Sequence, residues 1–364
     1  MDLATIKKIV LHVLSKYNVE KTYKRYKKNI TIKKLTKEQK KEIKDYYKEN
    51  FGINVTTKYH ELIYSICGVY KKEYMPFPVY YDLLDSLSPY DFRKVIDDKA
   101  LYEWLFPNIR LPKRIVTCCE GVTYAYSEDG IKREVCEKEL LEITYNLEKC
   151  VIKPSKNSSA GIGVKCITIV GGIVQETGKT SKQLFDSYHG NYVIEEKIIN
   201  NSNLKCLNPS SCNTLRVHTW RNRETATIEF ISAFLRVGRS GSIVDNAFSG
   251  GIAIPIDKNG KLSNSGCTFK PYKRIEHSDT GMVFKGYEIE KFQDIVEVAK
   301  KAHNNLPLFD FIGWDITVDE NENVVVIEFN GNPDMRLDQL IFLDTCLLDK
   351  QIPILSKVYK DKIN

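Results

Sequence analysis

The chain has 364 residues, of which 42% are hydrophobic and 28% are charged. This length and composition can bury a hydrophobic core and exclude a largely disordered chain. No apolar run reaches the roughly 18 residues that a membrane-spanning helix needs, so we expect a cytoplasmic protein without a transmembrane segment. The 10 cysteines are scattered and form no C-x-x-C pair, which favours reduced thiols over a disulfide framework or a zinc site.

Positive charge is concentrated in residues 1–50, which hold fifteen Lys or Arg and six Asp or Glu, against 54 and 47 in the whole chain. Such a segment can contact an acidic polymer or an anionic membrane surface. The alternative is an ordinary solvated helix surface. No helix-turn-helix or RNA-binding aromatic signature accompanies the charge, so we expect no specific recognition of nucleic acid.

The predicted elements change in character along the chain. Residues 1–95 have helical patterns rich in Lys and Tyr, whereas short β-type runs dominate from residue 115 onward. Strands and helices alternate without the strict order of βαβ units, which favours an α+β fold with largely antiparallel sheets. The predicted strands are residues 113–120, 150–155, 165–170, 191–198, 214–220, 226–238, 251–257, 311–318 and 323–330, and the clearest helix is 291–306.

The strongest chemical signal is the pair GWDITV and VVVIEFNGNPD, separated by the polar turn DENEN. A hairpin centred on residues 321–322 places Asp315 opposite Glu328, and Asn330 lies on the same face. Mg²⁺ accepts carboxylate and amide oxygens and would remove the repulsion between the two acids. A solvent-facing hairpin is the alternative. Four apolar neighbours are expected to face the core: Trp314, Ile316, Ile327 and Phe329.

A second signal is VIKPSKNSSAGIGVKCI, in which a predicted strand carries Lys153 into a run of small residues. Small residues let backbone N–H groups approach phosphate oxygens, and a lysine adds a positive charge. The order of lysine and glycines differs from that of the common phosphate-binding loop, and an ordinary turn is the alternative. The small residues proposed to bind phosphate are Ser158, Ser159, Gly161 and Gly163.

The third signal is NYVIEEKII, an apolar strand that ends in two acids. Strand-end backbone and a nearby acceptor commonly hold purine rings between apolar side chains. We therefore interpret Glu195, Glu196 and Ile198 as candidates for lining an adenine site. An ordinary strand end is the alternative.

These three segments, in this order, resemble the ATP-grasp superfamily. SSCNTLRVHTW, DNAFSGGIAIPID and the GWDITV hairpin are most similar to the branch called sugar-transfer associated ATP-grasp, over roughly residues 95–345. The resemblance implies an ATP-grasp fold, in which two α+β subdomains with largely antiparallel sheets clasp ATP. We predict a helical, basic accessory segment over 1–95, an N-terminal subdomain with a glycine-rich lid over 96–198, and a C-terminal subdomain with the metal site over 199–364.

The resemblance also implies the cofactors and their ligands. ATP phosphates would contact Lys99 and Lys153, adenine would contact Glu195, Glu196 and Ile198, and Mg²⁺ would bind Asp315, Glu328 and Asn330. The planar guanidinium of arginine suits a phosphate or carboxylate. Arg216 and Arg236 are therefore candidate catalytic residues, with a structural ion pair as the alternative, and His218 is interpreted as a packed histidine.

The resemblance implies an ADP-forming carboxylate–amine ligase that acts through an acyl phosphate in polysaccharide or sugar-conjugate biosynthesis. Its partners would be ATP and a small-molecule or glycan-linked acceptor. Two alternatives stay open: a kinase that phosphorylates a sugar hydroxyl, and a basic binding module without catalysis. A peripheral contact with the membrane through residues 1–50 is compatible with the cytoplasmic location.

Overall fold

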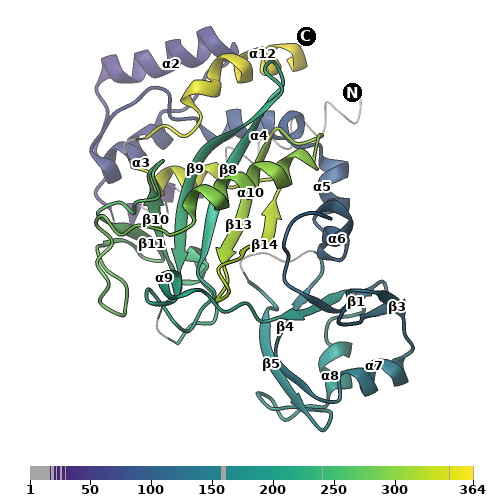
Figure 1. Cartoon of the computed structure of the whole chain (residues 1–364). Coiled ribbons are helices and arrows are strands. Elements are labelled where there is room, and N and C mark those ends of the chain that lie inside the picture. Colours follow the sequence, from purple (N-terminus) through teal and green to yellow (C-terminus); the bar gives the residue numbers. More distant parts are fainter. Residues whose placement is uncertain are drawn as a thin grey trace.

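The computed structural model describes residues 17, 20–21, 23–24, 27–28, 30–156, 161–239, 241–343 and 345–363. Within these residues a group of helices covers one end of the molecule and two seven-stranded sheets form the rest (Figure 1). Neighbouring strands are antiparallel in both sheets. The predicted α+β class is therefore confirmed. None of the described helices combines the length and apolar character needed to cross a membrane.

Several helices of the helical region have all their bounds within the continuously described residues from 30 onward. They are α2 (Lys37–Phe51), α3 (Lys58–Cys67), α4 (Phe77–Leu87) and α5 (Tyr90–Ile96). Thr36 and Gln39 form a capping box at the start of α2, and Gly52 ends the helix in a left-handed conformation with φ 70°, as the capping rules lead one to expect. Helix α2 buries Ile43 and Tyr47 at the i, i+4 spacing of one helix face.

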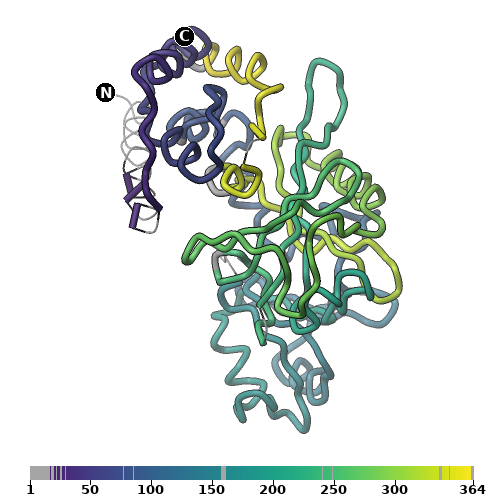
Figure 2. The backbone as a smooth tube through the Cα atoms, turned by 90° about the vertical axis from the view of Figure 1, so that its left-hand side faces the viewer, coloured from purple at the N-terminus to yellow at the C-terminus, as the bar shows by residue number. Residues whose placement is uncertain are grey.

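A helix near the C-terminus packs against the helical region. Helix α12 (Ile352–Ile363) contacts α2 and α4, and the rings of Phe51 and Tyr359 meet edge to face with centroids 5.6 Å apart. Figure 2 shows the purple helices and the yellow C-terminal helix on the same side of the molecule, away from the teal sheet. The C-terminal residues thus join the helical region, and the domain boundaries after residues 95 and 198 stay a prediction.

The first sheet has the strand order β3-β2-β1-β7-β4-β5-β6. Helices α7 (Glu137–Ile143) and α8 (Ser181–Asp186) accompany it. A short connection, η1 (Lys99–Leu101) and α6 (Tyr102–Leu105), leads into this sheet from the helical region. Its strands are β1 (Arg114–Cys119), β2 (Val122–Tyr126), β3 (Lys132–Glu134), β4 (Leu147–Pro154), β5 (Lys165–Val170), β6 (Ile173–Val174) and β7 (Tyr192–Glu196).

The second sheet has the order β12-β11-β10-β9-β8-β13-β14. Helix α10 (Phe292–Asn304) packs on one face, where it contacts β8, β9, β13 and β14. The shorter helices around this sheet are α9 (Ser202–Lys205), η2 (Ala247–Ser249), α11 (Met335–Ile341) and η3 (Asp349–Gln351). Its strands are β8 (Thr214–Asn222), β9 (Thr227–Val237), β10 (Ile252–Ile256), β11 (Gly266–Phe269), β12 (Tyr272–Ile275), β13 (Phe311–Val318) and β14 (Val324–Asn330).

The two faces of the second sheet have different partners. Leu215 and Val217 of β8 belong to the core that α10 covers. Trp220 and Phe311 point to the opposite face and join the core of the helical region. Because side chains alternate along a strand, Thr214, Arg216 and His218 share the face of Trp220, and it is this face that carries the polar residues described next.

Candidate active site

A cavity of about 870 Å³ lies between the two sheets, and residues of both sheets line it. Most of the site residues predicted from the sequence meet there. Those that line the cavity are Lys99, Lys153, Gly161, Glu195, Glu196, Ile198, Arg216, Arg236, Asp315, Glu328 and Asn330. Ser158 and Ser159 lie outside the described residues.

Gly163 does not line the cavity. Its carbonyl accepts a hydrogen bond of 2.7 Å from the Tyr188 hydroxyl. The residue has φ +79°, and an added Cβ would lie 2.8 Å from Pro154 Cγ. Glycine at this position is therefore explained by turn geometry and close packing rather than by a phosphate contact.

The β13–β14 hairpin has the register that the sequence predicts, because Asp315 pairs with Glu328 and Gly313 pairs with Asn330. The turn and the strand regularity of the hairpin differ from the prediction. Residues 319–323 form the turn, and the pairing shifts between Asp315 and Ile316, which is a β-bulge. The extra residue of a bulge reorients its neighbours. Ile327 consequently lines the cavity, and the expectation that it faces the core was wrong.

The register places the site residues in two adjacent rows across the strands. In the first row Glu328 pairs with Asp315, which pairs with Arg216, which pairs with Phe234. The second row runs through Asn330, Gly313, His218 and Ser232. Four strands thus bring together residues separated by up to about a hundred positions in sequence, because directly paired residues lie on the same face of a sheet.

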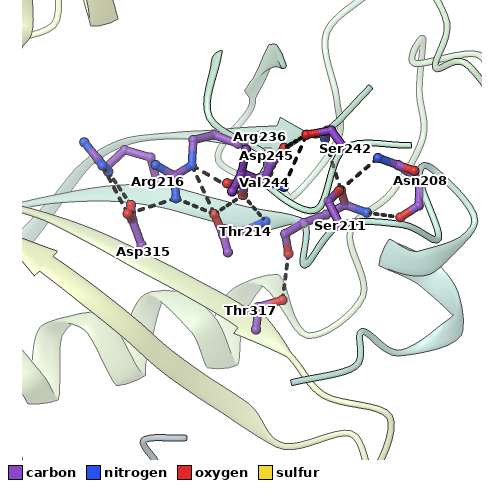
Figure 3. Close-up of polar contacts among 12 residues, drawn as sticks. Asn208, Ser211, Thr214, Arg216, Arg236, Ser242, Val244, Asp245, Asp315 and Thr317 are labelled. Atoms are coloured by element: carbon purple, nitrogen blue, oxygen red, sulfur yellow. Dashed lines mark hydrogen bonds and ion pairs between the residues drawn. The ribbon is translucent and has the colours of Figure 1, made fainter. Parts of the chain in front are cut away.

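Asp315 is the centre of a buried ionic network (Figure 3). Arg216 Nε lies 2.5 Å from Asp315 Oδ1, and Arg236 Nη2 lies 2.9 Å from Asp315 Oδ2. Burial alone would raise the pKa of the Asp315 carboxyl, but the two guanidinium groups outweigh this effect and hold it below its ordinary value. The three side chains are therefore charged and fixed relative to one another.

The network continues through Thr214 to Asp245. Arg236 Nη2 donates a 2.7 Å hydrogen bond to Thr214 Oγ1, and the Thr214 backbone N–H donates a 2.9 Å bond to Asp245 Oδ2. Burial raises the pKa of the Asp245 carboxyl despite the nearby Arg236. Arg236 thus has acidic groups on two sides, with Asp315 the closer partner.

The first sheet supplies a second buried ionic cluster. Lys153 Nζ lies 2.5 Å from Glu195 Oε2, and Arg114 Nη2 lies 3.2 Å from Glu195 Oε1. Burial would raise the pKa of the Glu195 carboxyl, but Lys153 and Arg114 lower it overall. Because both oxygens of Glu195 are engaged, this carboxylate positions Lys153 at the cavity. Glu196 Oε1 accepts hydrogen bonds from Arg110 (2.6 Å) and from the Lys113 backbone (2.7 Å).

Lys99 connects the two sheets. Its backbone N–H donates a 2.7 Å hydrogen bond to the Ser155 carbonyl, next to β4, and its Nζ lies 3.0 Å from Glu328 Oε1 on β14. Arg114 Nη2 donates a 2.9 Å bond to the Lys99 carbonyl. The side chain of Lys99 is almost completely buried, so its ammonium group is directed to the cavity by contacts from both sides.

The residues proposed to bind Mg²⁺ fit the chemistry of that ion. Asp315 and Glu328 offer carboxylate oxygens, and Asn330 adds an amide oxygen that also accepts a 2.8 Å bond from the Asn332 backbone. Mg²⁺ prefers such ligands and usually keeps positions for phosphate and water. Among the described residues, no group of three His, Cys, Asp or Glu could hold a metal ion.

Sequence reasoning missed several residues that line or support the cavity: Arg114, Thr214, Asp245, Asp334 and Asp338. Thr214 and Asp245 lie inside the motifs SSCNTLRVHTW and DNAFSGGIAIPID, so the motifs marked their neighbourhood. Asp338 follows the hairpin motif, and no signal in the sequence distinguishes it from a surface acid of a short helix.

A comparison with known families identifies the chain as an ATP-grasp protein. Residues 81–350 match the family described as Sugar-transfer associated ATP-grasp, and the chain belongs to that family. The resemblance found in the sequence is therefore confirmed. No curated protein matches the chain.

Several solved structures are similar to the chain. The ATP-grasp ligase PsnB, complexed with a phosphomimetic variant of its minimal precursor, Mg and ADP, is 11% identical with a TM-score of 0.39, and the match covers 74% of this chain and 61% of that one. N5-carboxyaminoimidazole ribonucleotide synthetase from Thermotoga maritima is 15% identical with a TM-score of 0.33, over 71% and 44% of the two chains. L-amino acid ligase from Bacillus licheniformis is 10% identical with a TM-score of 0.34, over 76% and 50%.

The chain thus spans less than two thirds of the length of these structures. Structural similarity at these TM-scores does not indicate the activity of this chain.

Proposed function

We propose that the protein is a magnesium-dependent, ATP-using ligase that forms ADP and joins a carboxylate to an amine through an acyl phosphate. The observation that supports this proposal is that Lys99, Lys153, two arginines and the Asp315–Glu328–Asn330 set line a single cavity. These residue types are suited to phosphate, to a transferring phosphoryl group and to Mg²⁺ respectively. The resemblance to ATP-grasp enzymes gives the reaction class.

The chain's own residues have separate tasks in this proposal. Lys99 and Lys153 bind phosphate oxygens, and each is held at the cavity by a carboxylate, Glu328 or Glu195. Arg216 and Arg236 stabilise the negative charge that develops as the phosphoryl group moves to the acceptor carboxylate. Mg²⁺, when bound by Asp315, Glu328 and Asn330, would neutralise charge on the phosphates. Glu195, Glu196 and Ile198, which all line the cavity, would line the adenine site.

The substrates belong to the same proposal. We place the acceptor among small molecules or glycan-linked carboxylates, and the protein in polysaccharide or sugar-conjugate biosynthesis in the cytoplasm. For residues 1–50 we favour a solvated surface over a peripheral contact with an anionic polymer or membrane. On α2 the exposed Lys37, Lys41, Lys44 and Lys48 follow one helix face, but Glu38, Glu42, Asp45 and Glu49 follow the adjacent face, which favours a solvated surface.

The test is an analysis of products with the full chain, ATP, Mg²⁺, a panel of sugar acids and amino acids as carboxylates, and hydroxylamine as the amine. A ligase releases ADP and free phosphate only when carboxylate and hydroxylamine are both present, and it forms a hydroxamate. A kinase leaves the γ-phosphate label on the acceptor, which would replace the ligase proposal by the sugar-kinase alternative. Absence of ATP binding would contradict both.

A further inference from the structure

The cavity continues past the ATP-binding residues to the short helix α11. Asp334, Asp338 and Ile341 line it at the spacing i, i+4, i+7, which is the spacing of one helix face. Phe234 of β9 and Phe269 of β11 line the cavity as well. This end therefore combines an acidic wall with apolar side chains, and none of these residues has a task in binding ATP or Mg²⁺.

Asp338 is the unusual group of this wall. Its exposed fraction is 5%, and its Oδ2 lies 3.0 Å from His218 Nε2. The two atoms do not meet the geometry of a hydrogen bond, so each is a buried polar atom without a hydrogen-bond partner among the described residues. His218 Nε2 is thus the nearest polar partner of this buried carboxylate oxygen.

His218 is held rigidly beside Asp338. Its Nδ1 lies 2.9 Å from Ser232 Oγ, and its ring stacks on Phe311 with centroids 5.5 Å apart. Gly313 makes this arrangement feasible, because a Cβ at that position would lie 3.4 Å from His218 Cδ2 and 3.1 Å from Arg216 Cδ. His218 therefore fixes the position of the Asp338 carboxylate at the cavity.

The two walls of the cavity differ in how their charges are paired, because Asp315 sits between the two arginines of the second sheet. Arg216 and Arg236 line the wall that the second sheet forms, whereas Asp334 and Asp338 line the wall that α11 forms. Asp338 interacts electrostatically with Arg216, so an amine bound by Asp338 would have its nitrogen near an acyl group held by the arginines. Two carboxylates suit an ammonium group better than a neutral hydroxyl, since the electrostatic gain depends on the charge.

We propose that this end of the cavity binds the amine co-substrate, and that Asp338 accepts a proton from it while His218 acts as a positioning residue. The inference rests on the proposed ligase function and gives its amine substrate a binding site and a proton acceptor. The bound ammonium gives one proton to Asp338, and the nitrogen lone pair forms the C–N bond with the acyl carbon. The bond between the acyl carbon and the phosphate oxygen breaks, and its electron pair stays on that oxygen. The departing phosphate takes the second proton from the nitrogen. Asp338 then releases the first proton to solvent.

The test is ligand-induced thermal stabilisation of the full chain in the presence of Mg²⁺ and a non-hydrolysable ATP analogue. The probes are glucosamine, ethanolamine, alanine and lysine, each compared with its N-acetylated counterpart, and glucose is the hydroxyl control. At least one amine is expected to raise Tm by about 2 °C or more at millimolar concentration. Its N-acetylated form and glucose are expected to give no shift.

Asp338→Asn should abolish the shift caused by the amine and keep the shift caused by the nucleotide, whereas Asp338→Glu should restore part of the amine response. Asp310→Asn is the matched control, because Asp310 is similarly buried at 7% exposure but does not line the cavity. Its amine response is expected to equal that of the native protein.

A measurement on the native chain covers the case in which Asp338→Asn does not fold. Hydrogen exchange of the backbone amides of residues 335–341 should slow with the amine and stay unchanged with its N-acetylated form. Equal responses to amine, N-acetylated form and glucose, or no response to any amine while the nucleotide still binds, would overturn this inference alone. Loss of nucleotide binding as well would contradict the ligase proposal itself.

Discussion

The two sheets contribute to the cavity in different ways. In the second sheet, Asp315, Arg216 and Arg236 stand on three strands and form direct contacts of 2.5 and 2.9 Å with one another. In the first sheet, Lys153 is held by Glu195, and the glycine-rich segment that follows it contributes Gly161 to the cavity. The second sheet therefore provides a preformed polar network, which is the arrangement that stabilises developing charge without reorganisation.

Breaking the preformed network should have the largest effect on stability. Asp315→Asn leaves Arg216 and Arg236 buried without their shared partner, and such a loss costs about 3–5 kcal/mol of unfolding free energy. Urea denaturation followed by circular dichroism measures it. Asp279→Asn is the control, because Asp279 pairs with Arg239 at a partly exposed site and should cost about 0–1 kcal/mol. Equal losses in the two variants would show that the network has no special energetic role.

Glu328 belongs to the same row but is partly exposed, with 38% of its side chain accessible. Glu328→Gln should lower turnover by about 10²–10³-fold, which is typical for the loss of one electrostatic contact to the transition state, and it should weaken Mg²⁺-dependent nucleotide binding while the fold is kept. ADP release and calorimetry with and without Mg²⁺ measure both effects. Glu320→Gln, an exposed change in the same hairpin, is the control. Native turnover in Glu328→Gln would remove the metal assignment.

The contribution of the first sheet is tested by Lys153→Ala. The variant loses one charged contact to phosphate, which is worth about 1.5–3 kcal/mol, so the ATP concentration needed for half-maximal turnover should rise by about 10–100-fold. Lys165→Ala removes an exposed lysine of the neighbouring strand that does not line the cavity and should leave this concentration unchanged. If both variants behave alike, Lys153 has no role in nucleotide binding.

The smallest expected effect is a pH dependence of the free energy of unfolding. It is caused by two buried histidines that do not line the cavity. Burial lowers the pKa of His303 behind the second sheet to about 4, and the pKa of His60 in the helical region also to about 4. In the unfolded chain these histidines have a pKa near 6.5. Below pH 6.5 the unfolded chain therefore binds more protons than the folded chain. The free energy of unfolding consequently falls as the pH falls. Each histidine should cost about 1 kcal/mol at pH 5.5.

Urea denaturation at pH 7 and pH 5.5 measures this slope. His303→Gln and His60→Gln should each flatten it by a similar amount, because the two groups have the same cause and direction of pKa shift. An unchanged slope in either variant would mean that the pKa of the replaced histidine is the same in the folded and the unfolded chain.

The local pattern was sufficient to predict the hairpin that carries Asp315 and Glu328, because alternation and the polar turn DENEN restrict the register. It was not sufficient to predict the bulge that turns Ile327 to the cavity. In a strand made mostly of apolar residues, one extra residue does not change the hydrophobic pattern in a recognisable way. The lysine of VIKPS and the acid of VIEE were singled out separately. That Glu195 engages Lys153 with one oxygen and Arg114 with the other depends on pairing among β1, β4 and β7.

The sequence by itself determined the family, the α+β class and the identity of the polar residues, because motifs and strand periodicity are local properties of the chain. Only the tertiary structure decided which charges meet. Arg216 binds Asp315 through the pairing of β8 with β13, and His218 adjoins Asp338 because α11 folds back over that sheet. Contacts between residues about a hundred positions apart follow from packing, and packing reflects the whole chain rather than any segment of it.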